Sequence, residues 1–326
     1  MQEDGAARAA GDAAAMGGSR DAVDVQEVDD PEQDQFEDAV DTSGSGTGAD
    51  AIGCAFRDMA EAARSWTLDG ALRDNAEIER SQVNALRSWC QESEILPDIA
   101  EPLLVAFLHC SRGDLEQAKA VVRVYESVRS KTPEVFADRS FHSEEVQRAK
   151  GVGYFCVLPN KTPEGYRVIV QALRDPDPTV FVYSSSSKAQ FLTMDAVVRA
   201  EPTAPGYVCV FDMNAVQMSH MWAWGIRLPR KVFRYLQEGL PLRMQRIHFL
   251  NTTPLMDRVM RMLRPFIRKE LQSIFQFHTA DDMENLYKMI PQDCLPENYG
   301  GFLPPLEKLQ DYTDKFLAEM NNMIPT

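Results

Sequence analysis

Three nearly continuous apolar runs in the second half of the chain constrain its fold most strongly. They are YRVIVQAL (166–173), GYVCVFDM (206–213) and RMQRIHFL (243–250), and SIFQFH (273–278) is a candidate for a further strand. Helix-like stretches separate them at Ser187–Arg199 and Pro229–Gln237. Apolar runs without polar alternation are typical of strands buried on both faces, and intervening helices are typical of parallel connections. The pattern predicts an α/β domain with a mostly parallel sheet.

Composition divides the chain into four segments. We expect residues 1–70 to form a disordered acidic tail, because its low-complexity first 50 residues cannot bury enough apolar surface to offset the loss of chain entropy. Helical periodicity over residues 71–140 predicts a small bundle, in which Asp114 is a candidate helix cap. Residues 141–310 form the α/β domain, and 311–326 a C-terminal helix or tail.

Charge is strongly segregated along the chain. Residues 1–50 hold 14 acidic side chains against Arg8 and Arg20, a net charge of −12, so residues 51–326 hold only −3 of the total of −15. By contrast, Arg227–Glu270 contains 11 Lys or Arg against three acidic residues, a local charge of +8. A partner of this basic segment is therefore expected to be anionic.

The same segment contains an amphipathic pattern. Apolar residues at helical spacing form one stripe, namely Val259, Met260, Met262, Leu263, Phe266 and Ile267. Arginines fall between them at positions 258, 261, 264 and 268. Periodicity alone favours an ordinary core helix with a solvated basic face. The alternative is a helix that contacts a lipid on one side and anionic headgroups on the other.

Signals for catalysis and for secretion are lacking. The sequence has no GxSxG, HExxH, P-loop or dinucleotide motif, and its five histidines are isolated. Asp212, at the end of the second apolar run, is interpreted as a cap for the following turn. Six single cysteines fit a reducing compartment, and no apolar run approaches the ~20 residues of a membrane span. We expect a cytoplasmic, non-enzymatic protein without cofactor, metal or nucleic-acid partner.

Five landmarks occur in an order that is specific as a set. They are the helical segment beginning LLVAFLHC, the strand GYVCVFDM, the segment LPRKVFRYLQEGLPLRMQRIHFLNTTP, the helix LRPFIRKEL and the closing LPENYGGFLPP. Over about residues 80–310 they resemble the CRAL-TRIO lipid-transfer family, which includes alpha-tocopherol transfer protein, cellular retinaldehyde-binding protein and the clavesins. The resemblance implies a carrier that holds one hydrophobic molecule in its α/β domain. It also implies that the helix from Pro254 to about Lys269 is a mobile gate.

The resemblance further implies which residues meet the ligand. The expected cavity wall is Val168, Val170, Phe191, Met194, Phe211, Val232, Leu236, Leu240, Ile247 and Phe249, and the expected gate lining is Met260, Leu263 and Ile267. Each strand residue has an even chance of facing the ligand, because successive side chains point to opposite faces. Flexible methionines suit an adaptable wall, and they crowd this region at positions 213, 218, 221, 244, 256, 260 and 262.

The polar contacts are predicted in two places. Inside the cavity, Tyr183, the serines 184–187, Ser219 or Tyr235 would pair with a polar headgroup. At the surface, Arg243, Arg264, Arg268 and Lys269 would contact an anionic membrane. Arg243 keeps a basic residue where the family contacts a phosphoinositide, but His109, Ser111, Glu270 and Ile274 depart from the basic residues of that pattern. Specific phosphoinositide binding therefore stays open.

The expected function is transfer of one lipid at anionic membranes, by a monomer that is transiently peripheral on them. Tocopherol, a retinoid and a phospholipid all fit an apolar cavity, so the ligand is not distinguished. The alternative function is a lipid-sensing adaptor whose acidic tail or helical bundle binds a protein partner.

Overall fold

A five-stranded sheet forms the centre of the computed structural model. The structure describes residues 47–220, 225 and 227–324. Within these ranges, the side chains at 47–50, 255, 259, 262, 263 and 270 are not described. The strand order follows the sequence, and only the first pair is antiparallel. The strands are β1 (Gly153–Lys161), β2 (Arg167–Leu173), β3 (Tyr207–Asp212), β4 (Met244–Leu250) and β5 (Phe275–Phe277). The predicted α/β class with a mostly parallel sheet is confirmed, and β1 adds a strand outside the predicted runs.

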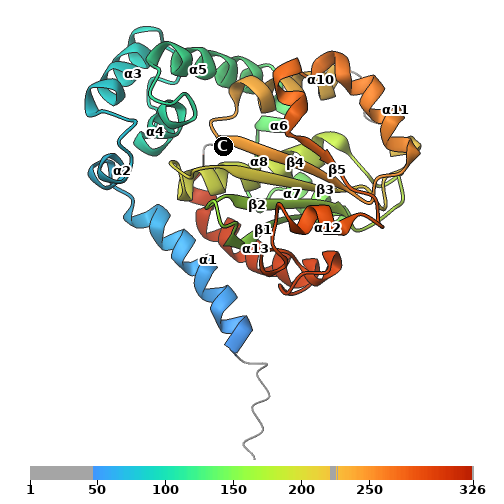
Figure 1. Cartoon of the computed structure of the whole chain (residues 1–326). Coiled ribbons are helices and arrows are strands. Elements are labelled where there is room, and N and C mark those ends of the chain that lie inside the picture. The colour runs from blue at the N-terminus through green and yellow to red at the C-terminus, as the bar shows by residue number, and fades with distance from the viewer. Residues whose placement is uncertain (1–46, 221–224, 226, 325–326) are drawn as a thin grey trace, which may run out of the picture. The chain divides into compact units, whose positions relative to one another are not determined.

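Three helical connections cover one face of this sheet. Helix α8 (Tyr183–Ala200) joins β2 to β3, α10 (Arg227–Arg234) with the π-helical turn η1 (Tyr235–Gly239) joins β3 to β4, and α11 (Pro254–Leu263) joins β4 to β5. Parallel strands that follow one another in order, with right-handed crossovers, place all their helices on the same side. Figure 1 shows α10 and α11 on one side of the sheet and α12 (Met283–Tyr287) and α13 (Leu306–Met320) on the other.

Helix α13 also protects the free edge of β1. Gln310 Oε1 accepts the backbone N–H of Phe155 at 2.7 Å, and Thr313 Oγ1 accepts that of Val157 at 3.1 Å. Edge strands with unpaired donors invite pairing with other chains. Here the side chains of a helix satisfy those donors, so the sheet grows no further in this direction.

The predicted helical bundle precedes the sheet in the chain. It comprises α2 (Leu68–Asp74), α3 (Arg80–Glu92), α4 (Glu101–Cys110), α5 (Leu115–Ser130) and α6 (Pro133–Phe136). Helix α7 (Glu144–Val152) follows and packs on α8 and β1. Asp114 caps α5 as predicted, because its side chain accepts the backbone N–H of Gln117 at 3.0 Å. Short 3₁₀ turns occur near the C-terminus at η4 (Gln292–Cys294), η5 (Glu297–Tyr299) and η6 (Asn321–Met323).

The prediction of disorder over residues 1–70 is wrong for its last part. Residues Thr47–Ser65 form helix α1, which buries Ile52, Phe56 and Met59 along one face. The ring of Phe56 stacks on Tyr312 of α13 with centroids 5.8 Å apart. This stripe recurs at helical spacing, and burying it stabilises a helix that its polar composition alone would not. Residues 1–46 lie outside the described residues.

The predicted single helix from Pro254 to about Lys269 is also corrected. Helix α11 ends at Leu263 and continues as the 3₁₀ turns η2 (Arg264–Phe266) and η3 (Lys269–Ile274), with Arg268 in an extended conformation between them. Pro265 explains the end of the helix, since a proline in a helix interior lacks the N–H donor and its ring clashes with the preceding turn.

Two histidines are buried beside the loop that leads into α11. His248 of β4 and His278, which follows β5, are hydrogen-bonded between Nδ1 and Nε2 at 2.9 Å. The backbone carbonyl of His278 accepts both the N–H and the hydroxyl of Thr252. Burial, followed by repulsion from His278 when it is protonated and from Arg246, lowers the pKa of His248 to about 3. Both rings are therefore neutral at physiological pH.

We expect the free energy of unfolding to fall by about 2 kcal/mol between pH 7 and pH 5 because of His248. Its ordinary pKa is 6.5, so the unfolded chain takes up a proton that the folded chain resists down to about pH 3. Stability is thus complete above pH 6.5 and is lost as the pH falls. Urea denaturation at several pH values measures this loss. The loss should shrink in His248→Phe and persist in the control His142→Gln, which changes an exposed histidine; an unchanged loss in His248→Phe would contradict the assignment.

Candidate functional site

An apolar cavity of about 160 Å³ lies between the sheet and the helices α8, α10 and α11. Six of the predicted wall residues line it together, namely Met194, Phe211, Val232, Leu236, Ile247 and Phe249. The sheet contributes alternate residues of β3 and β4, where Cys209 pairs with Ile247 and Phe211 with Phe249. The rings of Phe211 and Phe249 stack with centroids 5.5 Å apart. The floor of the cavity is therefore aromatic and rigid.

Four predicted wall residues lie elsewhere. Val168 and Val170 pair with Val208 and Val210, so they lie on the face of the sheet opposite to Cys209 and Phe211. Phe191 is buried between the rings of Phe136 and Tyr235 rather than on the cavity wall, and Leu240 is buried but does not line the cavity.

Two of the predicted gate residues belong to a small hydrophobic cluster that borders the cavity. Met260 and Ile267 pack with Met256, and the side chain of Leu263 lies outside the described residues. Met256 is the residue of α11 that lines the cavity wall, and Met213, Phe233, Phe249 and Phe275 of the same cluster also line it. Sequence reasoning missed Met213, Met244 and Met256 as individual wall residues. The crowding of methionines was the signal that could have found them.

The start of α11 is held by a defined turn. Asn251 adopts a left-handed backbone with φ of 53°, and its side-chain amide donates to Asp212 Oδ1 at 2.8 Å. Asp212 also accepts the backbone N–H of Asn214 at 2.9 Å and the hydroxyl of Tyr299 at 3.2 Å. The interpretation of Asp212 as a turn cap is confirmed. This carboxylate anchors the point from which α11 leaves the sheet.

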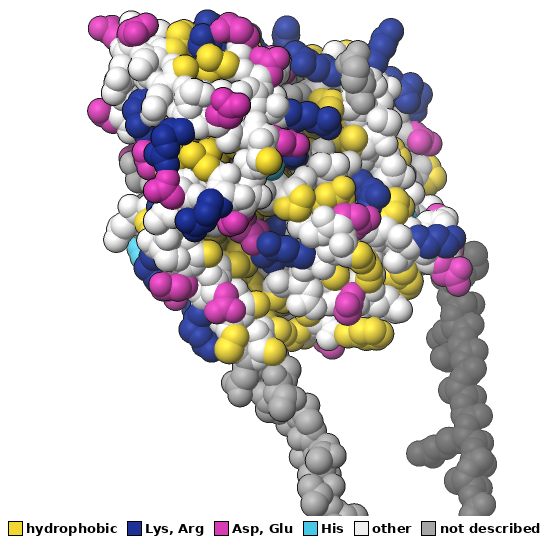
Figure 2. Space-filling view, turned by 60° about the vertical axis from the view of Figure 1, so that its left-hand side comes forward, with side chains coloured by type: hydrophobic (Ala, Val, Ile, Leu, Met, Phe, Trp, Pro, Cys, Tyr) yellow, Lys and Arg dark blue, Asp and Glu magenta, His cyan; other side chains and the backbone are white. Residues whose placement is uncertain are grey.

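The outer side of α10 and α11 is basic. Exposed side chains along it are Arg227, Arg230, Arg234, Arg258, Arg261, Arg264, Arg268 and Lys269, which we call the basic surface. In Figure 2, Lys and Arg side chains gather along the upper right of the face shown, at the height of α10 and α11 in Figure 1. Glu238 pairs with both Arg234 and Arg268, at 3.4 and 2.9 Å. On α11 itself, Arg258 and Arg261 are exposed whereas Met256 is buried.

Arg243 has different partners from the rest of the predicted membrane-contact set. Its guanidinium donates to the backbone carbonyl of His109 at 2.6 and 2.8 Å and forms an ion pair with Glu77. His109 is itself buried, with Nε2 2.9 Å from the carbonyl of Ala204. These contacts join the helical bundle to the α/β domain, so Arg243 is already engaged, whereas Arg264 and Lys269 are exposed.

A second, larger cavity of about 620 Å³ lies where α4 and α5 approach α8. None of the predicted wall residues lines it. Its wall includes Arg129 and Asp195, which form a buried ion pair that Arg139 joins at 2.6 Å. Burial alone would raise the pKa of Asp195, but the two guanidinium groups lower it. An apolar ligand here would lie against charged groups that it cannot pair, so the smaller cavity is the better lipid site.

Two general features bear on function. None of the described helices is long and apolar enough to cross a membrane. Within the described ranges, no group of three or more His, Cys, Asp or Glu side chains is placed to hold a metal ion.

Two family models match parts of this chain. Residues 152–301 match the model of the CRAL/TRIO domain, and residues 75–146 match that of the Pinta-like UBA domain. The alpha-tocopherol transfer protein-like protein of Homo sapiens is 26% identical over 266 residues, which cover 78% of this chain and 76% of that protein. Clavesin-2 of Homo sapiens is 21% identical over 217 residues, covering 65% and 66%. The crystal structure of Sfh5 aligns at 16% identity with a TM-score of 0.43, covering 65% of this chain and 76% of that one.

Proposed function

Because residues 152–301 form a CRAL/TRIO domain, the signature of a lipid-binding and transfer family, we propose that this chain carries a single lipid and exchanges it at anionic membranes. The observation that carries the proposal is the cavity between the sheet and the crossover helices, with Phe211 and Phe249 on its floor and Met256 of α11 on its wall. Its apolar lining suits a hydrophobic ligand, and we propose no catalytic activity for it. We place the protein in the cytoplasm, with transient attachment to membranes.

The small volume of the cavity supports the proposal that one of its walls moves when a ligand binds. Its volume of about 160 Å³ is below the roughly 300–1,000 Å³ typical of ligand pockets. Methionine side chains are flexible and polarisable, so Met213, Met244 and Met256 can fill space in the empty state and withdraw around a ligand. In the proposed cycle, α11 moves outward from the turn at Asn251, and Met256 leaves the cavity wall.

The basic surface supports the proposal that this opening occurs at an anionic membrane. Anionic lipids attract each nearby Lys or Arg by about 1 kcal/mol. Exposed arginines on α11 and on the turn that follows it, such as Arg258, Arg261 and Arg264, therefore bring the gate itself to the membrane. A released lipid then passes from the cavity into a bilayer rather than into water.

Native mass spectrometry of the purified protein, followed by lipid extraction, tests the proposal. We expect one lipid per chain, and we expect the protein to speed exchange of that lipid between donor and acceptor vesicles. A chain that contains no lipid and accelerates no exchange would contradict the proposed function.

The match of residues 75–146 to a Pinta-like UBA domain favours one further function. The helical bundle would then bind a protein partner, and the protein would act as a lipid-sensing adaptor. A partner that co-purifies through residues 75–146, without lipid exchange activity, would support this second function over the first.

A further inference from the structure

Two polar atoms at the cavity have no hydrogen-bond partner among the described residues. They are Oε1 of Gln171 and Nε2 of His220, and both are buried. Both residues line the cavity between the sheet and α8. Buried polar atoms in folded proteins are nearly always paired, so each exception calls for an explanation. In a binding cavity, the natural partner is the ligand.

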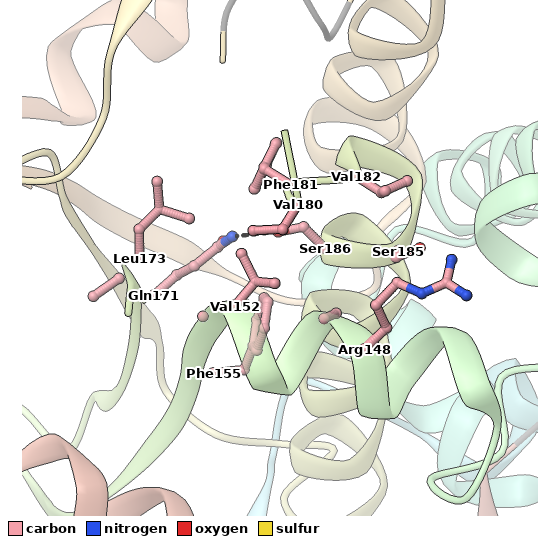
Figure 3. Close-up of a pocket in the computed structure, with 13 residues that line it drawn as sticks. Arg148, Val152, Phe155, Gln171, Leu173, Val180, Phe181, Val182, Ser185 and Ser186 are labelled. Atoms are coloured by element: carbon pink, nitrogen blue, oxygen red, sulfur yellow. Dashed lines mark hydrogen bonds between the residues drawn. The ribbon is translucent and has the colours of Figure 1, made fainter. Parts of the chain in front are cut away.

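The role of Gln171 follows from the bond that it makes. Its Nε2 donates to Ser186 Oγ of α8 at 3.1 Å, and Figure 3 shows the amide pointing from β2 toward that serine. Oε1 is consequently left as an acceptor. Gln171, Phe181 and Ser186 also border the narrow cleft drawn in Figure 3, which adjoins the cavity.

The role of His220 is the opposite. Its Nδ1 accepts the backbone N–H of Gln217 at 3.0 Å, which makes Nδ1 the unprotonated nitrogen. Burial lowers the pKa of this ring, so it is neutral and its proton lies on Nε2. His220 therefore presents a donor. Its ring packs edge-on against Phe181 with centroids 5.4 Å apart, and Phe181 borders the same cleft as Gln171.

An acceptor and a donor at one end of an apolar cavity complement a hydroxyl group, which donates one hydrogen bond and accepts others. We infer that the ligand is a neutral lipid whose polar end is a hydroxyl, which donates to Gln171 Oε1 and accepts from His220 Nε2–H. This inference rests on the proposed function and specifies its ligand class.

The charges around the cavity exclude an anionic head. No Lys or Arg occurs among the described residues that line it. Arg148 borders the adjoining cleft, but its guanidinium points away from Gln171 in Figure 3 and pairs with Glu144 at 2.6 Å. Asp212 adds a carboxylate to the wall. A phosphate or carboxylate head would enter without a counter-ion, which is unfavourable in an apolar site.

Three ligands of equal length distinguish the contributions of the two hydrogen bonds to affinity. 1-Dodecanol donates and accepts, 1-methoxyundecane only accepts, and tridecane does neither. Binding from neutral phosphatidylcholine vesicles to the full chain is measured by native mass spectrometry. For the unmodified protein we expect the alcohol to bind about tenfold more tightly than the ether, and the ether about tenfold more tightly than the alkane. Dodecanoate should bind more weakly than the alcohol by about tenfold or more.

Two variants assign the bonds to their residues. In Gln171→Leu the alcohol and the ether should bind alike, and in His220→Phe the ether and the alkane should bind alike. Gln272→Leu and His142→Phe make the same changes at exposed positions and should keep the full order. Equal binding of all three ligands, or a preference for dodecanoate, would overturn the inference and leave lipid carriage intact. Binding of none of them would count against the proposed function itself.

Discussion

Phe211→Glu is expected to empty the cavity. Phe211 lies on the floor beside Phe249, with the rings 5.5 Å apart. A carboxylate at this position would be desolvated by any apolar ligand, at a cost of several kcal/mol. Ligand affinity should therefore fall by about a hundredfold or more. Native mass spectrometry of the purified variant measures the bound fraction.

The matched control for this change is Phe302→Glu. Phe302 is 76% exposed, so the same substitution there leaves the cavity and the sheet untouched. Thermal unfolding separates loss of ligand from loss of fold, because a folded variant retains a cooperative transition. A folded Phe211→Glu protein that still carries one lipid per chain would show that the lipid binds elsewhere, for which the larger cavity beside Arg129 is the first candidate.

Arg264→Glu combined with Arg268→Glu is expected to slow lipid transfer to anionic vesicles at least tenfold. Loss of two cations removes about 2 kcal/mol of attraction, and the new carboxylates add repulsion. Transfer to neutral vesicles and ligand affinity should stay unchanged, since both side chains are exposed. Transfer of a fluorescent lipid between vesicles with and without phosphatidylserine gives both rates.

A control must separate the effect of where the charges lie from the effect of the change in net charge. Lys308→Glu with Lys315→Glu makes the same change in charge on α13, at the opposite face of the sheet, where both lysines are exposed. This control should keep the rate on anionic vesicles. Because Arg268 pairs with Glu238 at 2.9 Å, Arg258→Glu with Arg261→Glu provides a second test on α11 itself. Equal slowing by the α13 control would rule out docking through the gate.

Local chemistry made several features predictable. Asp114 was identified as a cap because a carboxylate before an apolar-periodic run satisfies free backbone donors, and it does so at 3.0 Å. Asp212 was identified as a structural residue at a strand end, and its bond to the backbone N–H of Asn214 bears this out. Both inferences depend mainly on neighbours close in the chain. Contacts of that kind are readable from a sequence.

The features that could not be predicted depend on contacts between residues far apart in the sequence. Arg243 and Arg264 are chemically equivalent in the sequence, but Arg243 is engaged by Glu77 and His109, which lie more than 130 residues away. Helix α1 was mistaken for tail because its stabilising partner, α13, lies at the other end of the chain. The pairing of Gln171 with Ser186, which leaves one buried acceptor unpaired among the described residues, needs β2 and α8 to meet in space.

The sequence by itself determined the α/β class, the helical bundle and the segregation of charge, because strand and helix periodicity and charge runs are local properties. Only the tertiary structure decided which face of each strand meets the cavity. Val168 and Val170 are as apolar as Ile247 and Phe249, but the first pair faces away from it. In a sheet covered on both sides the two faces carry the same kind of residue, so the pattern along a strand no longer tells them apart.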